Sequence, residues 1–367
     1  MIKTAFSTQA SAAAAVAELK QQSAGTDPRV ILCFASPRYD PAALSQELKT
    51  AFPKACIAGC TTAGEIVSGK MLSGSVVAMF LDSAVVGRAA CAIVEHIAGG
   101  AGARAALSTL ASEFGMPLSA MDIQKYAGIV LFDGLSGAEE RLMEEIGDLT
   151  DLFFVGGSAG DDLAFKSTHV FANGVAYTDA ALLLLLEIPG GFDIIKTQSF
   201  VPAGKTLVAT EVDVPNRTVI RFDGKPAVTA YAEAVGAAPE KAAGEFMLHP
   251  LGLMVDGQPY VRSPQRVQDQ AMAFYCRINE GAELQVLNGT DILADTRAAL
   301  AAKLAEMGQI SGIVDFHCIL RTLELRAEKR CDEYGRVFGD IPAVGFSTYG
   351  EAYLGHINQT STMLVLR

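Results

Sequence analysis

The sequence predicts an α/β protein of two domains, built from repeated strand-helix-strand-hairpin units with mixed sheets. Three observations support this fold class. Apolar strands alternate with amphipathic helices at the length of a βαβ unit, a short polar turn recurs after three of the strands, and hairpin signals follow each turn. Half of the 367 residues are hydrophobic, which suffices for large buried cores and argues against disorder.

Three segments have the same strand-helix-strand pattern, namely residues 29–65, 128–162 and 312–351. Each begins with an apolar strand, continues through a loop and an amphipathic helix, and ends with a second apolar strand. In the third segment, the connection between the two strands is longer than in the other two. Because a unit of about 35 residues is the size of a βαβ crossover, we expect the two strands of each unit to pair in parallel.

Strand-like segments with hairpin signals follow each unit. They cover residues 74–83, 168–188 and 361–367, and Asn173-Gly174 is the turn of the second. Before the first unit, residues 1–20 predict a short strand and a capped helix rather than a signal peptide. After the Asp223-Gly224 turn the pattern changes to a short helix, then strands and turns over 245–290, then a helix over 295–308. The sequence therefore predicts domains 1–222 and 223–367.

The polar turns share a hydroxyl residue, any residue, glycine and an acidic residue. They are Thr62-Ala-Gly-Glu65, Ser158-Ala-Gly-Asp161 and Thr348-Tyr-Gly-Glu351. The second and third turns lie almost twice as far apart as the first and second. This spacing suggests a fourth, degenerate copy near residue 256.

The turns admit three interpretations. The pattern Gly156-x-Ser158-x-Gly160 fits the nucleophile elbow of a serine hydrolase, but an elbow is followed by a helix, and the sequence after Ser158 has a hairpin pattern. A second interpretation is purely structural, because glycine permits close approach of strands while hydroxyl and acidic groups bond the turn amides. In a third, the turns converge at one sheet edge and bind a small polar ligand.

The ligand-binding interpretation specifies a set of candidate residues. Arg321 belongs to this set because a buried guanidinium needs an anion, which Glu351, Asp161 or a ligand carboxylate could supply. Cys60 could be a reactive thiol at a turn or an ordinary buried one. Asp161 and Asp162 have no further acidic or histidine group at metal-ligand spacing, so we expect no divalent metal site. The candidates are Cys60, Thr62, Gly64, Glu65, Gly157, Ser158, Asp161, Arg321, Thr348 and Glu351.

Charge and cysteine content restrict the location and the partners. A net charge of −12 and the absence of long Lys/Arg runs argue against nucleic acid and anionic membranes. The seven cysteines contain no Cys-x-x-Cys pair, which is typical of free thiols in a reducing compartment. The longest apolar run, residues 180–186, is too short to cross a membrane. We therefore expect a cytoplasmic protein.

Several motifs together resemble one known family. The segments FVGGSAGDD (154–162), DGKPAVTAY (223–231) and GFSTYGEAYLGHINQTSTM (345–363) are similar to those of FIST proteins of bacterial signal transduction. Cys318-Ile-Leu-Arg321 matches a Cys-x-x-Arg element of that family. The resemblance runs from about residue 29 to the end and implies a FIST N-terminal domain to 222 and a C-terminal one beyond.

The resemblance implies a sensor rather than an enzyme. FIST proteins are expected to bind small ligands, with amino acids as one proposed class. Without an output domain, the chain would signal through a separate partner. It is similar to stand-alone nitric-oxide-sensing haem proteins, which regulate a histidine kinase or a cyclic-di-GMP enzyme.

That branch of the family implies haem b held by a histidine. His249 is favoured as the axial ligand because it lies in an apolar run before Pro250, and His317 and His356 rank behind it. The alternative is that His249 is a hydrogen-bonded core or loop histidine. No Cys-x-x-Cys-His motif occurs, so covalent haem attachment is not expected.

Overall fold

The computed structural model describes residues 1–367 and confirms a mixed α/β architecture. It divides into two compact units. Unit 1 contains Met1–Lys196, Thr296–Gly355 and Ser361–Arg367, and unit 2 contains Thr197–Asp295 and His356–Thr360. Both units are discontinuous in sequence, because the chain enters unit 2 at Thr197, leaves it after Asp295 and returns to it at His356. No helix is long and apolar enough to cross a membrane.

Unit 1 consists of three repeats with the same order of elements. The first repeat contains β1 (Ile2–Ser7), α1 (Ala12–Gln22), β2 (Pro28–Ala35), α2 (Pro41–Ala51), β3 (Cys56–Thr61), β4 (Glu65–Val67), β5 (Lys70–Leu72) and β6 (Val76–Asp82). The second contains β7 (Arg88–Glu95), α3 (Arg104–Phe114), a short 3-10 turn (Leu118–Ala120), β8 (Tyr126–Phe132), α4 (Glu139–Leu149), β9 (Phe154–Ser158), β10 (Val170–Ala172), β11 (Val175–Tyr177) and β12 (Ala180–Glu187).

The third repeat follows the same order but is interrupted. It contains β13 (Phe192–Gln198), α7 (Ile292–Met307), β22 (Gly312–Cys318), α8 (Ile319–Ala327), α9 (Cys331–Gly335), a 3-10 turn (Arg336–Phe338), β23 (Ala343–Thr348), β24 (Glu351–Tyr353) and β26 (Thr360–Leu366). The short strand β25 (His356–Ile357) lies between β24 and β26 in the chain but belongs to unit 2. The chain of unit 2 separates β13 from α7. This insertion, and not a fourth copy of the turn, accounts for the doubled spacing, so the expectation of a degenerate repeat near residue 256 is wrong.

Each repeat forms the centre of its own sheet. The strand orders are β1-β6-β2-β3-β10-β11, β7-β12-β8-β9-β24 and β13-β26-β22-β23-β4-β5. The pairs β2/β3, β8/β9 and β22/β23 are parallel, as the βαβ pattern predicts. The strand after each turn joins a different sheet, because β4 pairs with β23, β10 with β3 and β24 with β9. This cyclic exchange of strands ties the three repeats into one body.

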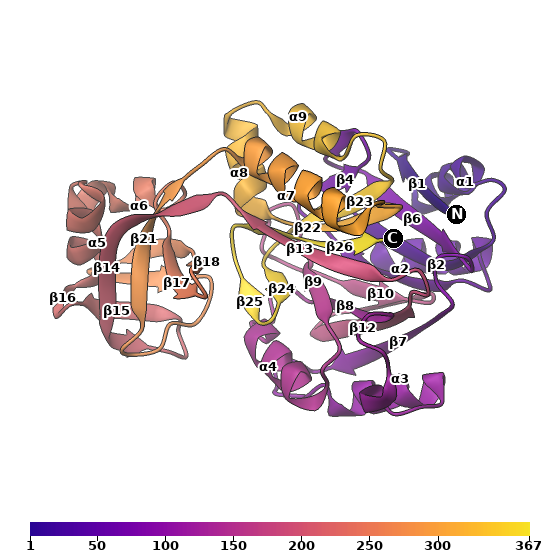
Figure 1. Cartoon of the computed structure of the whole chain (residues 1–367), viewed down its shortest axis with the longest axis horizontal. Helices are drawn as coiled ribbons and strands as arrows, with labels where there is room; N and C mark the ends of the chain where they lie inside the picture. The colour runs from indigo at the N-terminus through magenta and orange to yellow at the C-terminus, as the bar shows by residue number, and fades with distance from the viewer. The chain divides into compact units, whose positions relative to one another are not determined.

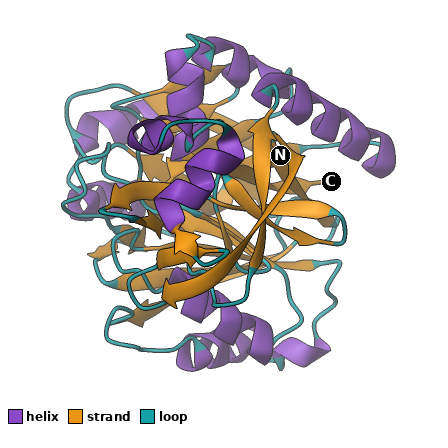
Figure 2. Ribbon diagram, turned by 90° about the vertical axis from the view of Figure 1, so that its left-hand side faces the viewer, coloured by secondary structure: helices purple, strands orange, loops and turns teal.

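The inner faces of the three sheets share one hydrophobic core. It includes Leu32 and Phe34 of β2, Ile129 of β8, and Val314 and Phe316 of β22. The helices lie outside the strands (Figure 2). Helices α1 and α2 cover the first sheet and α3 and α4 the second, while α8 packs against β22 and β23 of the third sheet (Figure 1).

Local sequence signals explain several element boundaries. Ser11 and Asp40 cap α1 and α2 by accepting from the backbone N–H of Ala14 and Ala43. The hairpin turn at Asn173-Gly174 is confirmed, and both residues have positive φ, at 49° and 100°. These backbone angles favour Asn and Gly at that turn.

Unit 2 is a small β-rich body. Its strands are β14 (Phe200–Asp213), β15 (Thr218–Phe222), β16 (Lys225–Pro226), β17 (Leu251–Val255), β18 (Gln258–Arg262), β19 (Pro264–Gln268), β20 (Ala271–Phe274) and β21 (Glu283–Gly289). They pair in the order β18-β17-β21-β14-β15-β20-β19. The predicted helix after Asp223-Gly224 is α5 (Ala227–Val235), and a 3-10 turn (Pro239–Lys241) and α6 (Ala242–Glu245) follow it. Helix α5 packs Val228 and Tyr231 into a core with Phe222 and Phe274.

Candidate functional site

The three polar turns meet at one place in unit 1. Gly160 N–H donates to Thr61 O at 3.0 Å, which joins the second turn to the first. Ser347 N–H donates to Gly64 O at 2.7 Å, joining the third to the first, and Ser158 N–H donates to Gly350 O at 2.8 Å, joining the second to the third. The strand ends therefore converge, as the sequence suggests.

The first and third turns close on themselves. Thr62 donates its hydroxyl to Glu65, and Thr348 does the same to Glu351. Glu65 also accepts from the N–H of Ser75 at 2.9 Å and from its hydroxyl at 2.6 Å. Burial raises the Glu65 pKa to about 7, and the bonds from Ser75 and Thr62 oppose that rise. These carboxyl groups hold their own turns together.

The second turn differs from the other two in register and in role. The parallel pairing of the strands aligns the three repeats. Gly156 is paired with Val130 in the second repeat. The corresponding pairs are Gly59 with Cys33 in the first repeat and Gly345 with Asp315 in the third. Ser158 is therefore equivalent to Thr61 and Ser347, one position away from the alignment that the motif suggests.

The Asp161 carboxylate accepts from the N–H groups of Phe165, Lys166 and Ser167 and from the Tyr349 hydroxyl at 2.6 Å. It shapes the loop that leads to β10.

Three further candidate residues have packing roles at this junction. A Cβ on Gly157 would lie 2.6 Å from the Cγ2 atom of Thr348, so only glycine lets these strands approach. Gly64 has φ of 136°, a backbone conformation that favours glycine. Cys60 is fully buried in the central core, and burial, with the neighbouring Cys33, raises its pKa well above the ordinary value. Its thiol is therefore of the inert, buried kind.

The structure does not give Ser158 the context of a nucleophile elbow. Ser158 ends β9, and the chain continues through a loop to β10 rather than into a helix. Its hydroxyl is fully buried and donates to Glu139 Oε1 at 3.2 Å. The partner is thus a carboxyl group on α4 rather than a histidine base.

A different feature distinguishes the third repeat. Two positions on the helix-facing side of the parallel strands can be compared among the repeats. The position of Asp315 is occupied by Cys33 in the first repeat and by Val130 in the second. The position of His317 is occupied by Ala35 in the first repeat and by Phe132 in the second. The first and second repeats are therefore apolar at both positions. In the third, Asp315 and His317 lie in a buried polar layer whose other members are Arg321, Tyr334 and Ser361. We call these five residues the polar layer.

Asp315 organises one end of the polar layer. Its carboxylate accepts from the Ser361 hydroxyl at 2.6 Å and from the Tyr334 hydroxyl at 2.9 Å. Burial raises the Asp315 pKa to about 6, while Ser361, Tyr334 and the positive charge of Arg321 oppose the rise. At neutral pH the carboxylate is mostly ionised, held by two hydroxyl donors.

His317 and Arg321 form the other end of the polar layer. His317 is fully buried and neither of its ring nitrogens has a hydrogen-bond partner. Its ring lies 4.3 Å from that of Tyr334, centroid to centroid. Burial, with the charge of Arg321, lowers the His317 pKa well below its ordinary value, so the ring is neutral. Arg321, only 1% exposed, donates from Nη2 to the Thr296 hydroxyl at 3.0 Å.

The polar layer adjoins the third turn. The Thr348 hydroxyl oxygen lies 3.3 Å from the backbone oxygen of His317, and the hydroxyls of Thr322 and Ser347 lie 2.7 Å apart. Among the candidate residues, Thr348 contacts the polar layer through His317, and Arg321 is a member of that layer. Asp315 and Tyr334 are not among the residues predicted from the sequence. The signal for Asp315 is present in the β22 segment GIVDFHC, where two polar residues alternate within an otherwise buried strand.

His249, the favoured haem ligand, lies in unit 2 and its side chain contacts three protein groups. Its side chain is 30% exposed, and Nδ1 lies 3.0 Å from Asn288 Oδ1 and 3.3 Å from Leu287 O. Its Nε2 atom lies 3.6 Å from a Glu245 carboxylate oxygen. Both ring nitrogens of His249 thus face protein groups.

His356 of unit 2 is buried and contacts Asn358. Burial, with the charges of Arg217 and Arg262, lowers its pKa to about 3.

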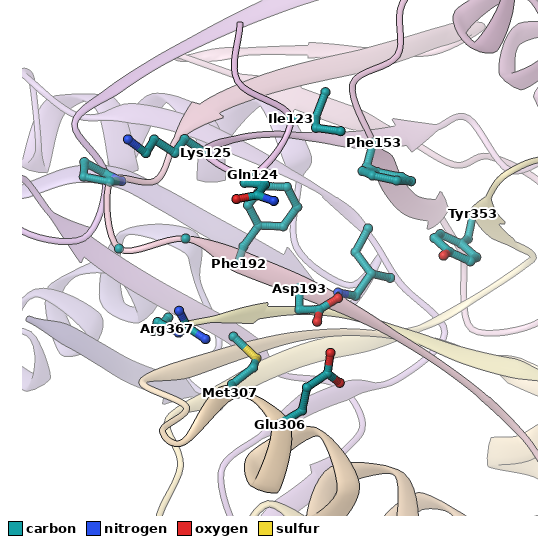
Figure 3. Close-up of a pocket in the computed structure, with 14 residues that line it drawn as sticks. Ile123, Gln124, Lys125, Phe153, Phe192, Asp193, Glu306, Met307, Tyr353 and Arg367 are labelled. Carbon is teal, nitrogen blue, oxygen red and sulfur yellow. The ribbon is translucent and has the colours of Figure 1, made fainter.

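An open pocket of about 620 Å³ lies elsewhere in unit 1. Figure 3 shows its aromatic side chains, Phe153, Phe192 and Tyr353, and the neighbouring carboxylates of Asp193 and Glu306. Lys303 binds both carboxylates at 2.7 Å, which offsets their charge. None of the candidate residues lines this pocket.

In this threefold repeated fold, only the third copy has a buried group of charged and polar side chains behind its parallel strands. The sequence matches the FIST N domain over residues 29–225 and the FIST C domain over residues 227–353. The chain belongs to the FIST family. FIST domains are sensory, signal-transduction domains.

One curated relative matches part of the chain. It is the uncharacterized protein MJ1623 of Methanocaldococcus jannaschii, which is 25% identical over 182 residues. The match covers 46% of this chain and 35% of the relative, so the chain spans about a third of that protein's length.

Proposed function

We propose that the chain is a sensor that binds a small carboxylate-bearing ligand, such as an amino acid, in the polar layer of the third repeat. The observation that carries this proposal is the fully buried His317, whose two ring nitrogens have no partner, beside the buried guanidinium of Arg321. A buried polar group without a partner costs free energy, so a ligand that supplies the partner gains that amount on binding.

The chemistry of the layer favours an anion. Arg321 presents a planar fork of donors that suits a carboxylate, and a neutral His317 offers one donor and one acceptor. The Thr322 and Ser347 hydroxyls lie at the edge of the same layer. Asp315 is already held by Tyr334 and Ser361, and its negative charge would favour a ligand that also carries an ammonium group.

Binding in a closed layer would couple recognition to movement. Helices α8 and α9 cover the layer and contribute Arg321 and Tyr334, so ligand entry requires them to shift. A ligand that binds one arrangement better than the other changes their populations. The changed surface would then be read by a separate protein, for which a histidine kinase or a cyclic-di-GMP enzyme is the proposed class.

The turns are a less favourable location for the same ligand. The Thr62–Glu65 and Thr348–Glu351 pairs bond internally, and Asp161 accepts four hydrogen bonds from its own loop and Tyr349. Their hydrogen bonds support a structural role at the junction of the sheets.

A thermal-shift panel of amino acids and dicarboxylates tests the proposal. A ligand present at a hundred times its Kd stabilises the native state by about 2.7 kcal/mol, which is a measurable rise in Tm. Arg321→Lys keeps the positive charge but loses the planar set of guanidinium donors, so it should remove most of the ligand-induced rise in Tm. Arg326→Lys, an exposed change in the same helix, should not. A panel without any stabilisation would contradict the proposal.

Haem with nitric oxide is a second candidate, and His317 supports it better than His249 does. The ring nitrogens of His317 are available, whereas those of His249 face Asn288, Leu287 and Glu245. Haem also needs a wide apolar pocket, and the charged neighbours of His317 suit a small anion better. A visible spectrum with added hemin decides the question, since a Soret band lost in His317→Phe and kept in His249→Ala would favour haem.

A further inference from the structure

Two cysteines from different sheets lie in direct contact. The Sγ atoms of Cys56, at the start of β3, and Cys91, on β7, are 3.0 Å apart. Both thiols are free and only partly buried, whereas Cys33, Cys60, Cys276 and Cys318 are buried. β3 belongs to the first sheet and β7 to the second. A bond between these sulfurs would link the first two repeats.

A pocket gives access to one of the two sulfurs. Cys56 lines a pocket of about 450 Å³ that reaches β7 only at Arg88, Ala89 and Ala90. Three basic side chains, Arg29, Lys54 and Arg88, line the same pocket with two acidic ones, Asp27 and Glu113. The pocket is therefore open to small molecules and slightly positive, which suits an anionic sulfur.

Two of these basic groups are held in place by backbone carbonyl groups. Arg88 donates to Phe114 O and Glu113 O at 2.9 Å, and Arg29 donates to Gly87 O at 2.6 Å. A fourth positive group, Lys49, lies near the thiols outside the pocket lining and donates to Ala55 O at 3.0 Å. The positive charge around Cys56 is thus a fixed feature of the fold.

The two thiols have different electrostatic environments. The hydrogen bond with Cys91 lowers the Cys56 pKa, and Lys49 adds to this effect against the opposing effect of burial. The same hydrogen bond and burial raise the Cys91 pKa. Cys56 is accordingly the more acidic thiol of the pair, and Cys91 is the less acidic one.

We propose that Cys56 and Cys91 form a redox-active dithiol that a hydroperoxide, such as hydrogen peroxide, converts into an intersheet disulfide. The Cys56 thiolate attacks one peroxide oxygen, the O–O bond breaks, and hydroxide leaves, so that Cys56 becomes a sulfenic acid. The Cys91 sulfur then attacks the Cys56 sulfur, the S–O bond breaks, and the Cys91 proton leaves with the hydroxyl group as water. Sulfur is oxidised and the peroxide is reduced.

Little movement is needed for the second step. A disulfide has a sulfur–sulfur length of about 2.05 Å, so the sulfurs must approach by about 1 Å. The product would cross-link β3 to β7, close to the core shared by the sheets. A thiol reductant would restore the dithiol by exchange.

The test is oxidation of the full chain by hydrogen peroxide, followed by alkylation under denaturing conditions and peptide mapping. The expected result is loss of two of the seven titratable thiols and one cross-linked peptide pair containing Cys56 and Cys91, reversed by dithiothreitol. In Cys91→Ser, Cys56 should accumulate as a sulfenic acid that dimedone labels. Cys331→Ser is the matched control, because Cys331 is also partly buried but has no cysteine partner, and it should form the disulfide as the wild type does.

Three results would overturn the proposal. They are retention of all seven thiols under conditions that oxidise a reference dithiol protein, oxidation of Cys331 ahead of Cys56, and a Cys91→Ser variant that binds no dimedone at Cys56. Peptide mapping of the wild type needs no variant, so it decides the proposal even if a substitution prevents folding.

Discussion

The first and third repeats have the same strand order, parallel pair and acidic turn, yet they differ in what lies between strand and helix. In the first repeat, Cys33 and Ala35 pack against Leu44 and Leu48 of α2 in an apolar cluster. In the third, the equivalent strand residues are Asp315 and His317, and the helix contributes Arg321. The fold tolerates either layer, so the polar one is not needed for folding and points to a function.

Removal of the Asp315 carboxylate should give the largest effect. Asp315→Ala leaves the Tyr334 and Ser361 hydroxyls without their acceptor and removes the negative charge beside Arg321. We expect a loss of about 3–5 kcal/mol in the free energy of unfolding, measured with urea. The equivalent change in the first repeat, Cys33→Ala, should cost only about 1 kcal/mol. Similar losses at both positions would show that the layers do not differ energetically.

The carboxyl group of Glu65 should make the protein less stable as pH rises. Its pKa is about 7 in the folded state against 4.5 normally, so the folded state holds the proton more tightly. Stability should therefore fall by about 3 kcal/mol between pH 4.5 and pH 8 through this group alone. Urea unfolding of Glu65→Gln across this range should lack that decrease, whereas the exposed control Glu240→Gln should retain it. Parallel pH profiles of wild type and Glu65→Gln would disprove the assignment.

Asp161 in the second turn should have the opposite pH dependence. Hydrogen bonds from Tyr349 and from the backbone of Lys166, Ser167 and Phe165 lower its pKa in spite of burial. Asp161→Asn should cost about 2 kcal/mol at pH 7, and the cost should disappear as pH falls below the ordinary pKa of 3.8. The neighbouring exposed change Asp162→Asn should cost no more than about 0.5 kcal/mol. An equal cost for both would contradict the role of Asp161 in its loop.

The smallest effect on stability should come from making the third repeat resemble the second. His317→Phe copies Phe132, which occupies the equivalent place, and removes two buried nitrogens without partners. We expect the free energy of unfolding to change by no more than about 1 kcal/mol, while any ligand-induced rise in Tm is lost. A large loss of stability with a retained ligand response would show that His317 is a structural residue.

Much of unit 1 could be predicted from the sequence because its signals are local. Alternating apolar segments identify the parallel pairs, and Asn173-Gly174 identifies a hairpin, through backbone preferences of a few neighbouring residues. The exchange of β4, β10 and β24 between sheets could not be predicted, since it depends on long-range pairing. The doubled spacing of the turns is compatible with a degenerate repeat and with the inserted unit 2, because spacing alone does not distinguish the two.

The site was only partly predictable for a related reason. Arg321 is identifiable as a basic residue in an apolar segment, and the recurrence of the turns marks their junction. The one-residue shift at Ser158 is invisible in the motif, because only the strand pairing of Gly156 with Val130 reveals it. The contact between Cys56 and Cys91 brings together residues of different repeats, and no spacing rule could have found it.

The most direct test of the central claim, that the third repeat's polar layer binds the ligand, is a calorimetric titration of the best carboxylate from the thermal-shift panel. Wild type and Arg326→Lys should bind it with the same Kd, whereas Arg321→Lys should bind at least about tenfold more weakly, because the loss of a bidentate contact to a charged group costs about 1.5–3 kcal/mol. Equal affinity in Arg321→Lys, with the variant folded as judged by its unfolding transition, would contradict the account.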